Sequence, residues 1–199
     1  MRVILAATLF LAGFSVAQAQ DALPREEALK AAFQLCRQLP KMLETPIPTD
    51  PDVKRPVGVC DANRGLMILP ESKLSLHDVA DAEAKAAQIG QLWMLRVVPN
   101  VAGQPASTDR LRMVDVNLDQ EDVTAVLCAL AVRKGADGKP ELLIYGKEKE
   151  PLLHVALTKI SEKQENPIEV SAERQGDTGT VTLKILGKYT ANFTVGANE

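Results

Sequence analysis

Two histidines and three cysteines are the side chains with which this chain of 199 residues could carry out nucleophilic chemistry. Cys60 precedes Asp61 beside an expected turn, and its thiol could attack a substrate if His77 or His154 took up the proton. The spacing of these residues matches none of the common catalytic motifs, because the chain lacks G-x-S-x-G, H-E-x-x-H, G-x-x-x-x-G-K-S/T and C-x-x-C. A hydrolase-like enzyme using Cys60 or His77 is therefore the alternative hypothesis, and we assign no catalytic residue.

Oxygen-bearing side chains alternate along the segment DVNLDQED, at Asp115, Asn117, Asp119 and Glu121. Such a series resembles part of a calcium loop, because Ca²⁺ prefers carboxylate and amide oxygens. An EF-hand loop requires Gly at its sixth position and Glu at its twelfth, where this chain has Gln120 and Val126. Because a strand with one solvated face gives the same alternation, we predict a strand here and no metal.

His77 is a second candidate for metal binding. Asp81 would share a helix face with His77, and Asp78 stands next to it. A catalytic zinc ion usually takes three protein ligands, and the second histidine, His154, stands between apolar residues much later in the chain. The sequence therefore predicts neither a metal nor another cofactor. We expect His77 to be solvated and His154 to lie on a strand at the edge of the core.

Residues 1–19 have the pattern of a secretory signal peptide. One arginine precedes an apolar run from Val3 to about Val16, and Ala17 and Ala19 occupy the −3 and −1 positions of a cleavage site. The run is shorter than a typical membrane-spanning helix. We expect a secreted or periplasmic protein, cut after Ala19, with no integral membrane span once the signal is removed.

The composition of the remaining 180 residues bounds the possible partners. Loss of Arg2 changes the formal net charge from −3 to −4. This mild negative charge gives no reason to expect nucleic acid or an anionic membrane surface as a partner, since either would call for a clustered basic face. Aromatic residues make up 4% of the chain, too few for a row of base-stacking platforms.

The most continuously hydrophobic part of the chain consists of three apolar runs, at Val123–Val132, Leu142–Tyr145 and Leu152–Leu157. The first run could be a helix, because acidic residues precede it and Arg133, Lys134 and Gly135 end it. A strand is favoured by its β-branched residues and by the short polar turn that leads into the second run. We predict a strand at 123–133 with apolar side chains on both faces, so that both faces must be covered.

Two helices are predicted before this central segment. The first, within residues 20–43, spans Arg25–Leu39, and its apolar residues recur along one face at Leu29, Ala32, Phe33, Cys36 and Leu39. Four prolines then make residues 44–56 an extended, structureless connection. The second helix is short, Ala-rich and on the surface, over Leu76–Ile89, with Gly90 placed to end it.

Residues 57–199 are predicted to form the β-rich domain. Turn residues at Asp61–Gly65 and at Gln175–Gly179 each separate two apolar runs, which predicts two hairpins. Val114, Val116 and Leu118 alternate with polar residues, as in a half-buried strand. We therefore predict a mainly β (α+β) fold, a β-sandwich-like domain of about eight strands with the two helices at its periphery.

The odd number of cysteines leaves at least one thiol without an intramolecular partner. Cys128 lies in the most apolar run, where a free cysteine behaves as a small buried hydrophobe. A Cys36–Cys60 bridge would tie the first helix to the sheet, and it is the pairing that we favour among three. A Cys60–Cys128 bridge would instead place the constraint within the sheet.

The sequence favours one class of function. Because no catalytic, cofactor-binding or metal-ligating set emerges, we expect a non-catalytic exported domain that binds a protein or another envelope component. The residue pattern does not identify that partner.

Overall fold

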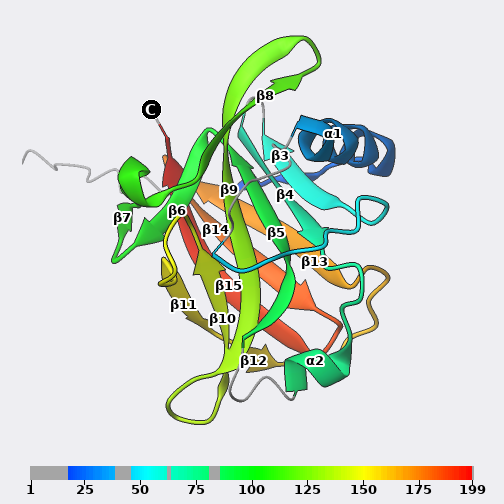
Figure 1. Cartoon of the computed structure of the whole chain (residues 1–199), viewed down its shortest axis with the longest axis vertical. Helices are drawn as coiled ribbons and strands as arrows, with labels where there is room; N and C mark the ends of the chain where they lie inside the picture. The colour runs from blue at the N-terminus through cyan, green and yellow to red at the C-terminus, as the bar shows by residue number, and fades with distance from the viewer. Residues whose placement is uncertain (1–17, 39–45, 62–63, 81–85, 199) are drawn as a thin grey trace, which may run out of the picture.

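Two antiparallel β-sheets packed face to face make up the computed structural model, which describes residues 18–38, 46–61, 64–80 and 86–198 (Figure 1). The predicted fold class, a mainly β, sandwich-like domain with an N-terminal helix, is confirmed. Within the described residues the sheets contain seven and eight strands, more than the eight expected in all. Four of these strands are only two residues long, and the other eleven are longer.

Sheet B, the eight-stranded sheet, is ordered β11 (Leu153–Ala156), β10 (Pro140–Tyr145), β9 (Glu121–Lys134), β5 (Ala87–Leu95), β4 (Arg64–Pro70), β3 (Val57–Asp61) and β2 (Asp21–Ala22). The eighth strand, β8 (Met113–Leu118), pairs with the first half of β9, whereas β10 pairs with its second half. Strands β3 and β4 form the first predicted hairpin.

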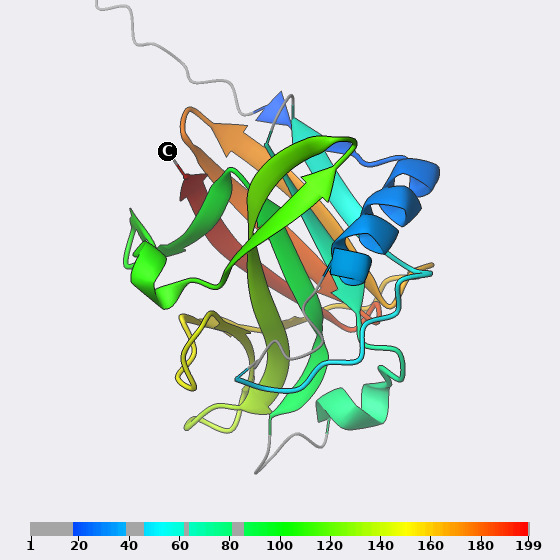
Figure 2. The ribbon, with the colours of Figure 1, turned by 45° about the horizontal axis from the view of Figure 1, so that its top comes forward.

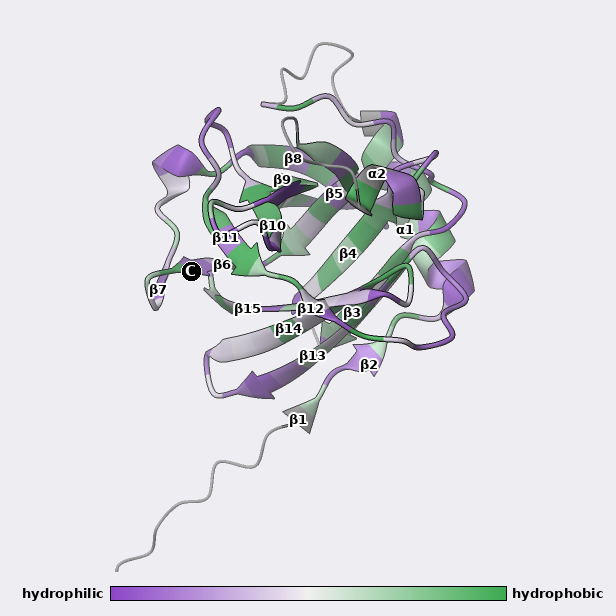
Figure 3. Ribbon diagram, turned by 90° about the horizontal axis from the view of Figure 1, so that it is seen from below, coloured by the Kyte–Doolittle hydropathy of each residue, from purple (hydrophilic) through white to green (hydrophobic). Residues whose placement is uncertain are grey.

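Sheet A is ordered β1 (Gln18–Ala19), β13 (Ile168–Gln175), β14 (Thr178–Ile185), β15 (Tyr189–Ala197), β6 (Val97–Val101) and β7 (Gln104–Pro105), and β12 (Thr158–Lys159) also pairs with β15. The second predicted hairpin is β13–β14, closed by a two-residue turn in which Gly176 has φ 62°. Alternate side chains of β14, such as Val181 and Leu183, are buried against sheet B. The hydrophilic outer side of β13 is visible in Figure 3.

Strand β9 is the centre of sheet B, and it is buried on both faces from Ala125 to Val132. One set of side chains points into the space between the sheets: Val126, Cys128, Leu130 and Val132. The alternate set points to the outer face: Ala125, Leu127, Ala129 and Ala131. The prediction of a strand rather than a helix at 123–133 is confirmed. Val126, Leu130 and Leu143 are buried.

The segment QLWMLRVV crosses from one sheet to the other. Its first part belongs to β5 in sheet B and its last part begins β6 in sheet A. Arg96, at the corner, has φ 56°, a left-handed conformation that turns the chain out of the first strand. The segment therefore contributes to two strands in different sheets.

Helix α1 (Arg25–Gln38) lies across the outer face of sheet B (Figure 2). Its buried side chains are Ala28, Ala32 and Leu35, which pack on apolar residues of β4, β5, β8 and β9. Phe33, placed on the buried face by the sequence pattern, is 65% exposed, so that assignment is wrong. The small alanines let the helix approach the bulky Met67 and Trp93 of the sheet, whereas Phe33 in the same place would hold it away.

The second predicted helix is shorter than expected. Helix α2 covers Leu76–Ala80, and Ala87 already begins β5. Residues 81–85 lie outside the described part of the chain. Ile89, expected at the end of this helix, is instead a fully buried strand residue. Pairing with β4 and β9 decides this part of the structure in favour of a strand, despite the alanines that precede it.

The proline-rich connection, expected to be structureless, is not: residues 53–54 form a turn, Pro51 forms a β-bridge with Glu71, and residues 46–50 lie against the outer face of sheet B. Ile47 packs on a small cluster formed by β9 and β10. The amide Nε2 of Gln91 donates to Thr49 Oγ1 at 2.8 Å, and Trp93 Nε1 donates to Gln91 Oε1 at 3.1 Å. These bonds satisfy polar atoms that the connection and the sheet bury together, so residues 46–50 form a second cover beside α1.

Most of the expected signal peptide, residues 1–17, lies outside the described residues. Gln18 and Ala19 form β1 at the edge of sheet A, where they pair with Arg174 and Glu173. The boundaries expected at residues 19, 43 and 56 remain predictions.

Truncation of Leu130 tests the central place of β9. We expect Leu130→Ala to lower the free energy of unfolding by about 2–5 kcal/mol, because the change removes buried apolar surface and leaves a cavity. Phe33→Ala is the matched control and should cost less than about 0.5 kcal/mol, because that ring is mostly exposed. Denaturant titration of both variants measures the difference. A loss below about 1 kcal/mol for Leu130→Ala would contradict the position of this strand.

Candidate functional site

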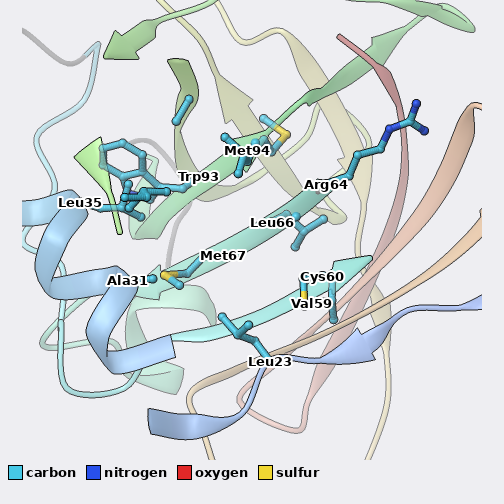
Figure 4. Close-up of a pocket in the computed structure, with 14 residues that line it drawn as sticks. Leu23, Ala31, Leu35, Val59, Cys60, Arg64, Leu66, Met67, Trp93 and Met94 are labelled. Atoms are coloured by element: carbon cyan, nitrogen blue, oxygen red, sulfur yellow. The ribbon is translucent and has the colours of Figure 1, made fainter. Parts of the chain in front are cut away.

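A groove lies between helix α1 and the outer face of sheet B (Figure 4). It is open to solvent on one side and has a volume of about 190 Å³. The side chains around it are almost all apolar, and they include Leu23, Ala31, Cys60, Met67, Trp93 and Leu118. Its apolar lining makes this groove the candidate binding site.

The groove lies over a row of residues across sheet B in which two residues have little or no side chain. Asp21, Cys60, Gly65, Leu95 and Ala125 stand directly opposite one another on neighbouring strands, which places their side chains on one face. Gly65 has no side chain, and Ala125 has only a methyl group. The helix above presents Ala31, another small residue. Short side chains on both sides leave space between the helix and the sheet.

A polar extension continues the groove along α1. It shares Leu23, Ala31 and Leu118 with the apolar part and is otherwise lined by polar residues. Lys30 Nζ lies 2.5 Å from Asp119 Oδ1, and Gln34 Nε2 donates to the same oxygen at 3.2 Å. These bonds join the helix to the β8–β9 turn, and the bond from Lys30 is the main cause that lowers the pKa of Asp119.

The β8–β9 turn is formed by Asp119 and Gln120, whose φ values are 52° and 73°. Left-handed φ at both central residues is the geometry of the tight hairpin turns that match the twist of two strands. The turn therefore holds Asp119 at a fixed place beside α1, where it forms one wall of the polar extension.

Cys60 is the only thiol that lines the groove within the described residues. Burial raises its pKa, and the negative charges of Glu27, Asp21 and Asp61 raise it further. A cysteine attacks substrates as its thiolate, so this environment weakens Cys60 as a nucleophile at neutral pH.

The residues of the predicted catalytic set do not converge. Cys60 pairs with Gly65 near one end of the β3–β4 hairpin, whereas α2, which carries His77, follows Pro70 at the other end. Five residues of strand separate Gly65 from Pro70, or about 17 Å. His154 lies on β11, at the opposite edge of the sheet, with four strands between it and β3. Neither histidine can take a proton from Cys60 directly in this arrangement.

Both histidines are exposed, as expected for a solvated His77 and for His154 at the edge of the core. His77 is exposed on α2, while the side chain of Asp78 and all of Asp81 lie outside what the structure describes. The side chain of His154 is 48% exposed, and its Nδ1 lies 3.2 Å from Glu141 Oε2. Glu141 also accepts a hydrogen bond from Arg133 Nε at 3.0 Å. These three residues form a hydrogen-bonded polar group across β9, β10 and β11.

The oxygen-bearing residues considered for calcium are engaged elsewhere. Asp115 Oδ1 accepts a hydrogen bond from Thr124 Oγ1 at 2.7 Å, and Asn117 Nδ2 donates to Asp122 Oδ1 at 2.8 Å. Both pairs are cross-strand neighbours of β8 and β9. Asp115 and Asn117 are exposed and alternate with buried Val114 and Val116, which confirms the half-buried strand. Among the described residues, no group of three His, Cys, Asp or Glu side chains is placed to hold a metal ion.

The expected Cys36–Cys60 bridge is absent, because all three cysteines are free thiols. Cys60 pairs across strands with Asp21, just before α1 begins, whereas Cys36 lies in the last turns of that helix. Eleven residues of helix separate Arg25 from Cys36, or about 16 Å along the axis. The helix is held by its packed alanines and Leu35 rather than by a covalent link. Cys128 is fully buried, as expected.

Comparison with known proteins adds no assignment: no family model matches the sequence, and neither a curated protein nor a solved structure matches it significantly. The interpretation of the groove therefore rests on its own geometry.

The sequence pattern did not predict the groove. Two local signals belong to it: Gly65 within a strand, which often marks a close approach or a gap, and the series of alanines in α1. Neither signal becomes specific until the pairing of β2, β3, β4, β5 and β9 brings the row of small residues together.

The three thiols should differ in reactivity toward an uncharged maleimide. Cys60 lines an open groove, whereas burial raises the pKa of Cys36 to about 11 and that of Cys128 to about 12. We expect Cys60 to be labelled first, about tenfold faster for each pH unit between 7 and 8, and Cys128 only on unfolding. Peptide mapping by mass spectrometry measures the order. Faster labelling of Cys36, or a Cys36–Cys60 disulfide in the non-reduced digest, would contradict these environments.

Proposed function

We propose that the protein is an exported, non-catalytic β-rich domain that binds a protein or another envelope component through the groove beside α1. The observation that carries the proposal is an apolar hollow of about 190 Å³ that opens to solvent and in which, among the described residues, the pKa of the lining thiol Cys60 is raised and neither histidine is nearby. Open apolar hollows of this kind mark places where a second molecule is bound, because exposed apolar surface is otherwise unfavourable in water.

The alternative, a hydrolase-like enzyme using Cys60 or His77, finds less support. Covalent catalysis requires a nucleophile and a base within hydrogen-bond reach, and Cys60 lies far from both histidines. The charges around Cys60 also raise its pKa, whereas a catalytic thiol needs the opposite shift. A binding function requires neither condition.

The charge of the chain supports the class of partner that we propose. The formal net charge is −3, and the groove carries more acidic than basic side chains near its mouth, which is unfavourable for nucleic acid. In the described part of the chain, no helix combines the length and the apolar character that a bilayer crossing requires.

Export is tested at the N-terminus. If the signal peptide is cut after Ala19, Edman or mass-spectrometric sequencing of protein isolated from its own host should begin at Gln20. The same cut would remove Gln18 and Ala19 and leave the edge of β13 unpaired at Glu173 and Arg174. Retention of Met1 on the isolated protein would refute export by this route.

Filling the groove tests the binding function. We expect Ala31→Leu to place a larger side chain between α1 and the sheet and to abolish capture of the partner from an envelope extract of the host. Leucine is a good helix former, so the helix should persist, and circular dichroism with thermal unfolding checks this. Ala136→Leu, at an exposed position in the β9–β10 turn, is the matched control and should capture as well as the unmodified protein. Equal capture by the Ala31→Leu protein would refute the groove as the binding site.

A further inference from the structure

Two exposed carboxylates, those of Asp21 and Glu27, lie next to the groove. Asp21 lies on the same face of sheet B as Cys60, its cross-strand neighbour. Glu27 lies on the first turns of α1 and lines the polar extension. Within the part of the chain that the structure describes, neither has an ion-pair partner. Both are exposed to solvent.

The other charges near the mouth are compensated. Lys30 is paired with Asp119 at 2.5 Å, and Asp61 with Arg174 at 2.7 Å. Arg64 precedes Gly65 on β4, so its side chain leaves the opposite face of the sheet, toward Asp177 at 3.6 Å. What remains at the entrance is a net negative charge from two side chains. The rise in the pKa of Cys60, to which Glu27 and Asp21 contribute, is consistent with a negative potential there.

The size of the apolar part restricts what can fill it. Its volume of about 190 Å³ is close to that of an engineered 150 Å³ cavity that binds benzene. Pockets for drug-sized ligands are larger, at about 300–1,000 Å³. The apolar lining also ends where the polar extension begins, at Leu23 and Leu118. One aromatic ring therefore fits, whereas a long acyl chain would have to continue across charged side chains.

We propose that the groove seats a single aromatic side chain of a protein partner, with a lysine or arginine next to it in the partner sequence that contacts Asp21 and Glu27. This inference rests on the proposed binding function and specifies the partner of the same site. A buried aromatic anchor supplies most of the affinity in many interfaces, and charged residues at the rim add orientation and discrimination. The two unpaired carboxylates repel an anionic lipid headgroup, which favours a peptide over a lipid as occupant.

Three blocked tripeptides test the proposal: Ac-Lys-Trp-Lys-NH₂, Ac-Glu-Trp-Glu-NH₂ and Ac-Lys-Ala-Lys-NH₂. Titration into ¹⁵N-labelled protein, up to millimolar concentration, should shift the backbone amide signals of Ala31, Cys60 and Gly65 only with the two tryptophan peptides. We expect the basic tryptophan peptide to bind about fivefold more tightly than the acidic one, from two rim contacts of the strength of exposed ion pairs. The preference should disappear in 1 M NaCl, because salt screens such contacts.

Variants separate the charge from the apolar contact. Asp21→Asn combined with Glu27→Gln should bind both tryptophan peptides equally, whereas Ala31→Leu should bind neither. Glu150→Gln combined with Glu165→Gln removes two exposed charges outside the groove and should keep the fivefold preference.

The outcomes distinguish this inference from the function on which it rests. Equal binding of the basic and acidic tryptophan peptides to the unmodified protein would refute the basic partner residue and leave the groove as a binding site. Shifts of the same amides with decanoate but not with either tryptophan peptide would refute the protein partner in favour of a lipid. No shift with any probe would refute the groove as an apolar binding site, and the proposed function with it.

Discussion

The burial of β9 on both faces is the constraint on which the rest of this structure depends. Eight consecutive residues, Ala125 to Val132, are buried, and no single neighbouring layer can cover both sides of a strand. Sheet A covers the inner face with the alternating side chains of β14 and β15. Within the described residues no second sheet covers the outer face. Helix α1 covers the first half of the strand there, and residues 46–50 cover the second half.

A cylindrical helix cannot pack closely against a sheet over its whole length. The groove lies where α1 and sheet B are not in close contact. Helix α1 approaches closely because Ala28 and Ala32 are small, and Leu35 fills the space that remains toward the centre of the sheet. Along the groove the sheet contributes the small residues Gly65 and Ala125, and the helix contributes Ala31 beside Leu35. Burial of β9 and the presence of a hollow beside it are thus two results of one packing arrangement.

The parts of the fold that could be predicted from the sequence are those that depend on local periodicity. Alternation identified β8, because a strand with one solvated face shows its pattern whichever strand it pairs with, and turn residues identified the hairpins β3–β4 and β13–β14. The face of α1 could not be predicted from its largest apolar residues. Sheet B presents Met67 and Trp93 and so selects the alanine face, leaving Phe33 in solvent. The groove was beyond prediction because Asp21, Gly65 and Ala125 meet only through the order of the strands.

The carboxylates that make Cys60 a poorer nucleophile also favour the non-covalent binding that we propose. Burial and the charges of Glu27, Asp21 and Asp61 keep the Cys60 thiol protonated, so the floor of the groove is uncharged near neutral pH. An uncharged apolar floor gains free energy when it loses contact with water, without the cost of burying a charge. Asp21 and Glu27 stay at the rim, where they remain hydrated, add little to affinity and act mainly on the rate and orientation of approach. Affinity and selectivity therefore come from different side chains of the groove, and each can be removed without the other.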